Sequence, residues 1–99
     1  MKKRLSAEYT MLAILEYMCL YASNTPVSKY RIMRIEGLST QRPDRIARIL
    51  EMLERNGYIE SIKTPTAIYY KVTEKGLNIY NKWVKDFLEF VRELGREVG

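Results

Sequence analysis

The final quarter of the chain carries the pattern that most limits what this sequence can fold into. Between residues 77 and 94, apolar side chains recur three and four residues apart, which predicts a long helix with a coiled-coil seam. The seam comprises Leu77, Tyr80, Val84, Phe87, Val91 and Leu94. A second apolar line beside it comprises Ile79, Trp83 and Phe90. Together the two lines cover roughly half of the helix circumference, which is wider than the stripe of an ordinary surface helix.

So wide an apolar surface is more than a small domain covers by itself. The chain has 99 residues, which predicts a single domain over residues 1–99 whose last helix occupies residues 73–98. We expect a second copy of the chain to cover the remainder; the alternative is a helix that packs across its own domain. The expected dimer interface consists of Leu77, Tyr80, Trp83, Val84, Phe87, Phe90, Val91 and Leu94.

Three shorter helices are expected in the first half of the chain. Apolar periodicity predicts one over residues 6–21 and another over residues 28–36, the second capped by Ser28 and ended by Gly37. The third helix begins after a cap at Ser39 or Thr40 and ends near residue 55. Pro43 falls in its first turn, where the missing N–H is harmless.

A β-hairpin follows the third helix. Residues 58–63 and 67–72 are rich in strand-forming side chains and are separated by a turn at residues 64–66. Neighbouring side chains of a strand point to opposite faces, so at most one of Tyr69 and Tyr70 enters the core. Thr73 is the expected N-cap of the last helix. The fold class predicted is therefore mainly α with a small β-hairpin.

The net charge of +5 is concentrated in the first half of the sequence. Residues 1–48 hold nine basic and four acidic residues, whereas residues 49–99 hold eight of each. The basic residues gather at positions 2–4, at 29, 31 and 34, and at 42, 45 and 48. A basic footprint confined to one part of a small domain is typical of nucleic-acid binding.

Catalysis and metal binding are disfavoured by what the composition lacks. The chain has no histidine, the commonest general base and metal ligand near neutral pH. Its single cysteine, Cys19, forms no internal disulfide, suits a reducing cytoplasm and is interpreted as a small buried hydrophobe. No apolar run is long enough for a membrane span or a signal sequence. We expect a cytoplasmic protein that is not an enzyme and has no metal, cofactor or evident small-molecule ligand.

The order of helices and strands resembles that of winged-helix proteins, and two motifs carry the resemblance. The first is Ile46-x-x-Ile49-Leu50-x-x-Leu53-x-x-x-Gly57-Tyr58-Ile59, and the second is Tyr70-Lys71-Val72-Thr73-Glu74-Lys75-Gly76. The first motif resembles the stretch in which a recognition helix ends and the first wing strand begins. The second motif resembles the second wing strand and the start of the dimer helix that follows it. The chain is similar to PadR-like and MarR-like regulators. It is also similar to small winged-helix proteins of archaea and their viruses that have a C-terminal coiled coil.

The resemblance implies a DNA-binding function. Residues 6–72 would form the helix-turn-helix and wing, with the third helix in the major groove. Base-reading side chains would be Gln41, Arg45 and Arg48, because arginine pairs with guanine and glutamine with adenine. The residues expected to contact the sugar–phosphate backbone of the DNA are Ser28, Lys29, Arg31, Ser39, Thr40, Arg42, Lys63, Thr64 and Thr66.

We therefore expect a homodimer that binds double-stranded DNA, most simply as a transcriptional regulator. One alternative is a chromatin-type protein that binds DNA with little sequence preference. Another is a winged-helix module that contacts only other proteins. The basic third helix argues against the protein-only alternative.

Overall fold

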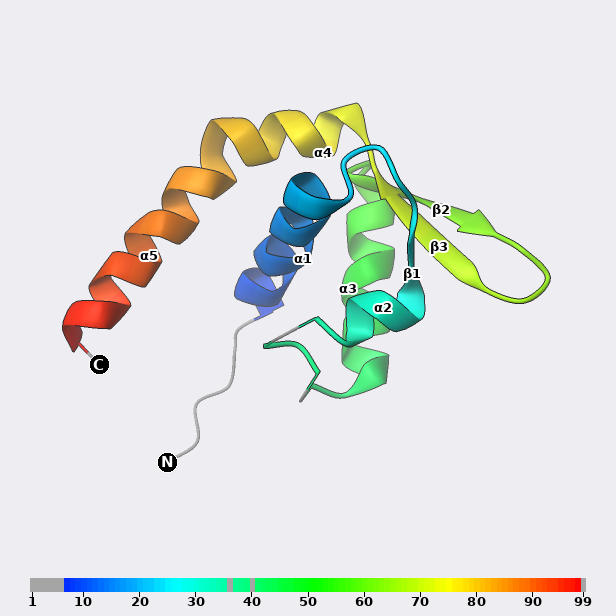
Figure 1. Cartoon of the computed structure of the whole chain (residues 1–99), viewed down its shortest axis with the longest axis horizontal. Helices are drawn as coiled ribbons and strands as arrows, with labels where there is room; N and C mark the ends of the chain where they lie inside the picture. Colours follow the sequence, from blue (N-terminus) through cyan, green and yellow to red (C-terminus); the bar gives the residue numbers. More distant parts are fainter. Residues whose placement is uncertain (1–6, 36, 40, 99) are drawn as a thin grey trace.

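The computed structural model describes residues 7–35, 37–39 and 41–98. The basic residues at positions 2–4, Ser6 at the start of the first expected helix, Glu36 and Thr40 lie outside this part of the chain. The described chain folds into helices around a small sheet (Figure 1). Its elements are α1 (Ala7–Tyr21), β1 (Val27–Ser28), α2 (Lys29–Met33), α3 (Pro43–Arg55), β2 (Ile59–Lys63), β3 (Ile68–Val72), α4 (Glu74–Ile79), the π-helical segment η1 (Tyr80–Val84) and α5 (Lys85–Val98).

The helices and the sheet are arranged around α1. In Figure 1, α3 stands beside α1, the hairpin β2–β3 projects to one side, and α4 to α5 arches over the end of α1. The core between them is formed by side chains that are almost entirely buried, among them Ile14, Met18, Ile32, Ile46, Leu50 and Leu88. α3 contributes the apolar face that its sequence period predicts, with Ile46, Ile49, Leu50 and Leu53 buried. Because the apolar side of α3 packs into this core, its opposite side faces solvent.

The sheet has one strand more than the sequence predicts. β1 pairs with β3 in antiparallel register, Val27 opposite Tyr70 and Ser28 opposite Tyr69, so the strand order is β1-β3-β2. A two-residue strand shows no alternation, which is why the pattern of the sequence does not reveal it. Tyr70 is buried and Tyr69 is half-buried, as expected for opposite faces.

Two helix boundaries differ from those expected. α2 ends at Met33 rather than near residue 36, and Gly37, with φ of +90°, serves the turn that follows. α3 has Arg42 at its N-cap, without a side-chain cap bond, so the expected cap at Ser39 or Thr40 is wrong. Proline suits the first helical position, and the structure accordingly starts α3 at Pro43. The caps expected at Ser28 and Thr73 are confirmed, since each hydroxyl accepts a backbone N–H three residues on.

The two motifs that suggest a winged helix contact each other. Thr73 Oγ1 donates to the carbonyl oxygen of Gly57 at 2.6 Å, and Lys75 Nζ donates to that of Asn56 at 2.8 Å. Lys75 also lies over the Tyr58 ring at 4.7 Å. A Cβ at Gly76 would meet the backbone oxygen of Tyr58, so the glycine permits the close approach. This contact anchors the start of α4 against the turn between α3 and β2.

The long C-terminal helix is continuous but not regular. Its middle turn, η1, is π-helical, which shifts the face that the following residues present. Tyr80, Val84 and Leu88, each four residues from the next, are buried in the core of their own chain. Tyr80 and Val84, which were expected at the dimer interface, therefore pack inward instead, and Leu88, which the spacing left out, joins them.

Candidate functional site

The outward side of α3 carries the arginines that the sequence predicts for DNA contact. Arg42 and Arg48 are exposed, and Asp44 lies between them. Arg42 Nε is 3.3 Å from Asp44 Oδ1, and Arg48 Nη2 is 3.5 Å from Asp44 Oδ2. Exposed ion pairs of this kind contribute about 1 kcal/mol or less, so both arginines can leave Asp44 for a stronger partner.

Arg45 is less accessible than the other two arginines. It is half-buried and helps to line a shallow hollow of about 400 Å³ between the start of α3 and Ala7. The hollow is also lined by Arg42, Asp44 and Arg48. The structure thus brings the three expected arginines together at the start of α3, with Arg42 and Arg48 the more exposed.

Gln41 does not take the place expected for it beside Arg45 and Arg48. It precedes α3, so the helical spacing assumed for it does not hold. Its Nε2 donates to Thr10 Oγ1 of α1 at 2.9 Å, and its Oε1 is buried with no hydrogen-bond partner among the described residues. Thr10 itself is fully buried. In this conformation Gln41 links α1 to the start of α3 instead of offering its amide to a base.

The expected contacts on α2 are held at its beginning. Ser28 Oγ accepts the backbone N–H of Arg31 at 3.1 Å, Lys29 is half-buried and Arg31 is exposed. Sequence reasoning did not assign a site to Tyr30, which is 69% exposed, or to Arg34. The signal was available, because residues four apart lie on the same side of a helix.

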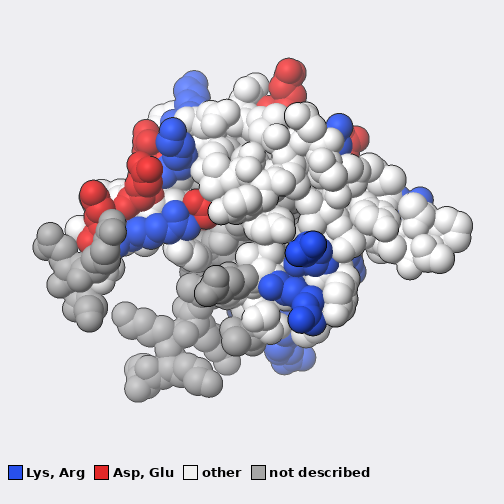
Figure 2. Space-filling view, viewed as in Figure 1, with Lys and Arg blue, Asp and Glu red and all other residues white. Residues whose placement is uncertain are grey.

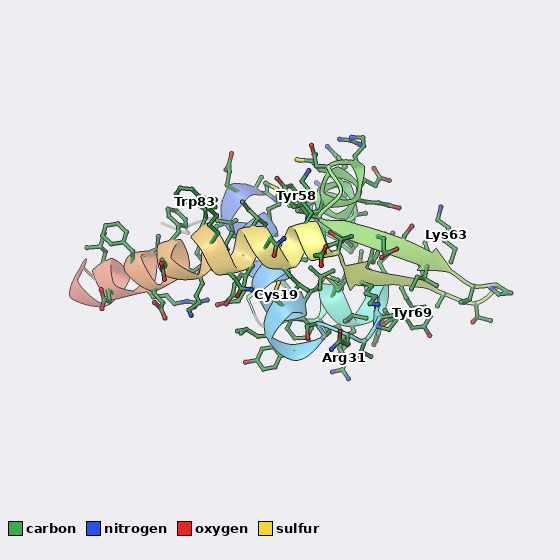
Figure 3. The ribbon with its side chains drawn as sticks, turned by 90° about the horizontal axis from the view of Figure 1, so that it is seen from above. Cys19, Arg31, Tyr58, Lys63, Tyr69 and Trp83 are labelled. Atoms are coloured by element: carbon green, nitrogen blue, oxygen red, sulfur yellow. The ribbon has the colours of Figure 1, made fainter. Side chains whose placement is uncertain are left out.

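The wing, formed by the hairpin β2–β3, carries few polar groups suited to DNA. Lys63 and Thr66 are exposed. Thr64 Oγ1 accepts the backbone N–H of Ala67 at 3.0 Å and donates to the Ala67 carbonyl at 3.0 Å, so it serves the turn. Figure 3 places Lys63 on the other side of the wing from Arg31 and Tyr69.

Charge is distributed unevenly over the molecule. In Figure 2, Lys and Arg side chains gather over α2 and below it, while Asp and Glu side chains gather on α5. Of the residues expected to contact DNA, Ser39 is exposed in the turn before α3. Thr40, also expected there, is outside the described chain. One group of basic side chains therefore lies at the helix-turn-helix end, whereas on α5 basic residues such as Lys85 and Arg92 lie among acidic ones.

The C-terminal helix exposes an apolar stripe formed by Trp83, Phe87, Phe90 and Leu94, which are each between 49% and 62% exposed. These residues are spaced 4-3-4, the repeat that brings apolar groups to one side of a coiled-coil helix. Leu77 and Val91 are half-buried beside them. Figure 3 shows Trp83 on the side of the helix opposite Cys19. Four of the eight expected interface residues thus form a continuous exposed surface.

Cys19 and a cavity both lie at α1. Cys19 is half-buried, and burial raises its pKa to about 11. A cavity of about 650 Å³ lies between α1 and the residues Ile35, Gly37 and Leu38, with Arg92 of α5 also in its lining. Within the described residues, no helix is long and apolar enough to cross a membrane. The same residues contain no group of three or more metal-ligating His, Cys, Asp or Glu side chains.

Known structures share this fold, although no protein-family model and no curated protein sequence matches the chain. A transcriptional regulator from Clostridium thermocellum superposes with a TM-score of 0.68 at 20% identity, over 97% of this chain and 100% of that one. A PadR family transcription regulator from Clostridium difficile gives 0.66 at 14% identity, over 92% and 99%.

A longer structure gives the same result. A transcriptional regulator from Thermotoga maritima superposes with a TM-score of 0.62 at 17% identity, over 91% of this chain, but this chain spans only 61% of its length. At these identities the likeness concerns the fold. The chain has a winged-helix fold, which confirms the fold that its two sequence motifs indicate.

Proposed function

We propose that this chain is a homodimeric DNA-binding protein that regulates transcription by placing α3 in the major groove. The observation that carries the proposal is the exposed pair Arg42 and Arg48 at the start of α3, on a winged-helix framework. An arginine can bond O6 and N7 of guanine together, and a helix fits the width of the major groove. The similar solved structures are described as transcriptional regulators, which supports this function.

The proposed dimer interface is the apolar stripe of Trp83, Phe87, Phe90 and Leu94. Large exposed apolar surfaces on small proteins mark interaction sites, and a heptad-spaced stripe fits a second copy of itself. A two-fold dimer would present two α3 helices to half-sites about 34–36 Å apart, or a multiple of that distance. The expected DNA site is therefore roughly palindromic.

One observation favours a second candidate, a chromatin-type protein with little sequence preference. Gln41 was the expected adenine reader, and its amide instead bonds to Thr10. Arg42 and Arg48 alone can serve phosphates as readily as guanines. The two candidates share the DNA-binding face and differ only in how much sequence they read.

A titration of duplex DNA at two salt concentrations tests the proposal, with random and selected sequence pools and protein of known oligomeric state. Six to ten phosphate contacts would give a log–log slope of about −5 to −9. An enriched palindrome would support the regulator, and salt-sensitive binding without enrichment would support the chromatin-type protein. No binding in either pool would contradict both and favour a protein-interaction module.

Single substitutions on α3 refine the test. Arg48→Ala should weaken specific binding by about 1–3 kcal/mol. Asp44→Asn should strengthen binding, because it removes the carboxylate that lies between Arg42 and Arg48. Arg55→Ala, at the other end of α3, is the matched control and should lose less than Arg48→Ala. If all three variants bind as the original chain does, the start of α3 is not the contact.

A further inference from the structure

We propose that Tyr30 and Arg34 of α2 form a preassembled clamp for a phosphate of the DNA backbone beside the groove that α3 occupies. The inference rests on the proposed DNA-binding function and extends it to two residues, Tyr30 and Arg34, that the sequence analysis did not assign to a site. It names two residues, a ligand group and a contact geometry. Its partner is the sugar–phosphate backbone of duplex DNA.

The side chains of Tyr30 and Arg34 already contact each other. Arg34 Nη1 donates to the Tyr30 hydroxyl at 3.0 Å, and the Arg34 guanidinium carbon lies 5.3 Å from the centre of the Tyr30 ring. A pair held by a hydrogen bond and a cation–π contact has lost part of its side-chain freedom before any ligand arrives. Binding would therefore order these groups at a reduced entropic cost.

The pair faces away from the core. Ile32 is fully buried, and Tyr30, two positions before it in α2, lies about 200° around the helix, on the opposite side. Tyr30 is accordingly 69% exposed, and Arg34 is exposed as well. An aromatic ring of that exposure contributes little to the fold, so its contact with Arg34 is free to serve a ligand.

The chemistry of the pair fits an anion. A phenol oxygen that accepts one hydrogen bond keeps its own O–H to donate, and a guanidinium with one N–H committed retains four others. Both groups can therefore donate to the oxygens of one phosphate, and charge-assisted bonds of this type are the stronger ones. Arg31, also exposed on α2, adds positive charge nearby.

The place of α2 in the fold favours the DNA backbone as the source of that phosphate. α2 and α3 follow one another in the chain, with only a short connection between Met33 and Pro43, and Lys and Arg side chains gather over α2 in Figure 2. In helix-turn-helix proteins the helix before the recognition helix crosses the DNA backbone. A phosphate contact at α2 would fix the orientation of α3 without reading sequence.

The test is a salt-dependent titration of one labelled duplex with the full chain and four variants. Tyr30→Phe keeps the ring and removes the hydroxyl, and should weaken binding about three- to tenfold. Arg34→Gln should weaken binding about tenfold and reduce the magnitude of the salt slope by about one. Tyr21→Phe and Lys85→Gln are matched controls at exposed positions on α1 and α5, and should bind like the original chain.

The outcomes separate this inference from the function on which it rests. If the original chain shows salt-sensitive binding and both α2 variants bind as tightly with an unchanged slope, the clamp is overturned while DNA binding stands. If the original chain binds no duplex at low salt, both are overturned. Weaker binding by Arg34→Gln and Tyr30→Phe, with unchanged controls and unchanged thermal unfolding, would support the clamp.

Discussion

Arg92 of α5 binds Glu16 of α1 through two parallel hydrogen bonds. Arg92 Nη2 is 2.7 Å from Glu16 Oε1, and Nη1 is 3.0 Å from Oε2, across a separation of 76 residues. The hydrogen bond to Glu16 raises the pKa of Arg92 above its ordinary value. The pair fastens the second half of the C-terminal helix to the helix-turn-helix, so it sets where the apolar stripe lies relative to α3.

Breaking this pair should loosen that attachment modestly. The Arg92 side chain is 47% exposed, so solvent screens the interaction, and Arg92→Met should lower the free energy of unfolding by about 1 kcal/mol. A double-mutant cycle with Glu16→Gln, measured by urea unfolding, should give a coupling of similar size that falls as salt rises. Lys85→Met in the same helix is the control. Zero coupling would show that the pair does not hold α5.

Gly76 and Gly95 offer a matched pair of glycine substitutions. A Cβ at Gly76 would meet Tyr58 backbone and Val72 Cγ2, whereas a Cβ at Gly95 would meet nothing within 4 Å. We expect Gly76→Ala to lower the free energy of unfolding by more than about 2 kcal/mol, through overpacking. Gly95→Ala should be neutral or stabilising by up to about 1 kcal/mol, from helix propensity. Equal stability of the two variants by urea unfolding would contradict the close approach at Gly76.

Leu88 and Phe87 are neighbours in sequence with different expected roles. Leu88 is 1% exposed, so Leu88→Ala should lower the free energy of unfolding by about 2–5 kcal/mol. Phe87 lies on the exposed apolar stripe, so Phe87→Ser should leave the monomer folded and weaken dimerisation. Sedimentation at several protein concentrations measures the second effect, and circular dichroism the first. A dimer unaffected by Phe87→Ser would show that the stripe is not its interface.

Cys19 should react slowly while the protein is folded. Burial raises its pKa from 9.0 to about 11, so the thiolate fraction at pH 8 falls roughly a hundredfold. The unfolded thiol ionises first, so this burial contributes stability that is present below about pH 9 and is lost as pH rises to about 11. Reaction with a disulfide reagent, in native buffer and in urea, measures the difference. Equal rates in the two conditions would contradict burial.

Much of the fold could be predicted because it depends on local patterns. Ser28 and Thr73 cap helices as their side chains predict, and the hairpin forms where strand-forming residues flank a turn. The arginines at the start of α3 were expected from the amphipathic pattern of that helix, and they lie together there. Such features follow from interactions between residues a few positions apart.

Contacts between distant residues were not predictable in the same way. The bond from Gln41 to Thr10 spans 31 residues and turns an expected base reader inward. The strand at Val27–Ser28 exists only because β3 offers it an edge. Tyr30 and Arg34 are four residues apart, a local spacing, yet their exposure becomes clear only when Ile32 is seen packed in the core.

The hairpin, the long C-terminal helix and the amphipathic face of α3 could be predicted because they follow from strand and helix periods, and the positions of Lys and Arg predicted the basic first half of the chain. Which apolar residues of the last helix stay exposed depends on packing against the rest of the fold. The π-helical turn and the packing of α1 against η1 draw Tyr80, Val84 and Leu88 inward and leave Trp83, Phe87, Phe90 and Leu94 outside. A broad apolar pattern in the sequence indicates how much of a helix surface needs a partner. The position of the neighbouring helix determines which part of that surface is covered.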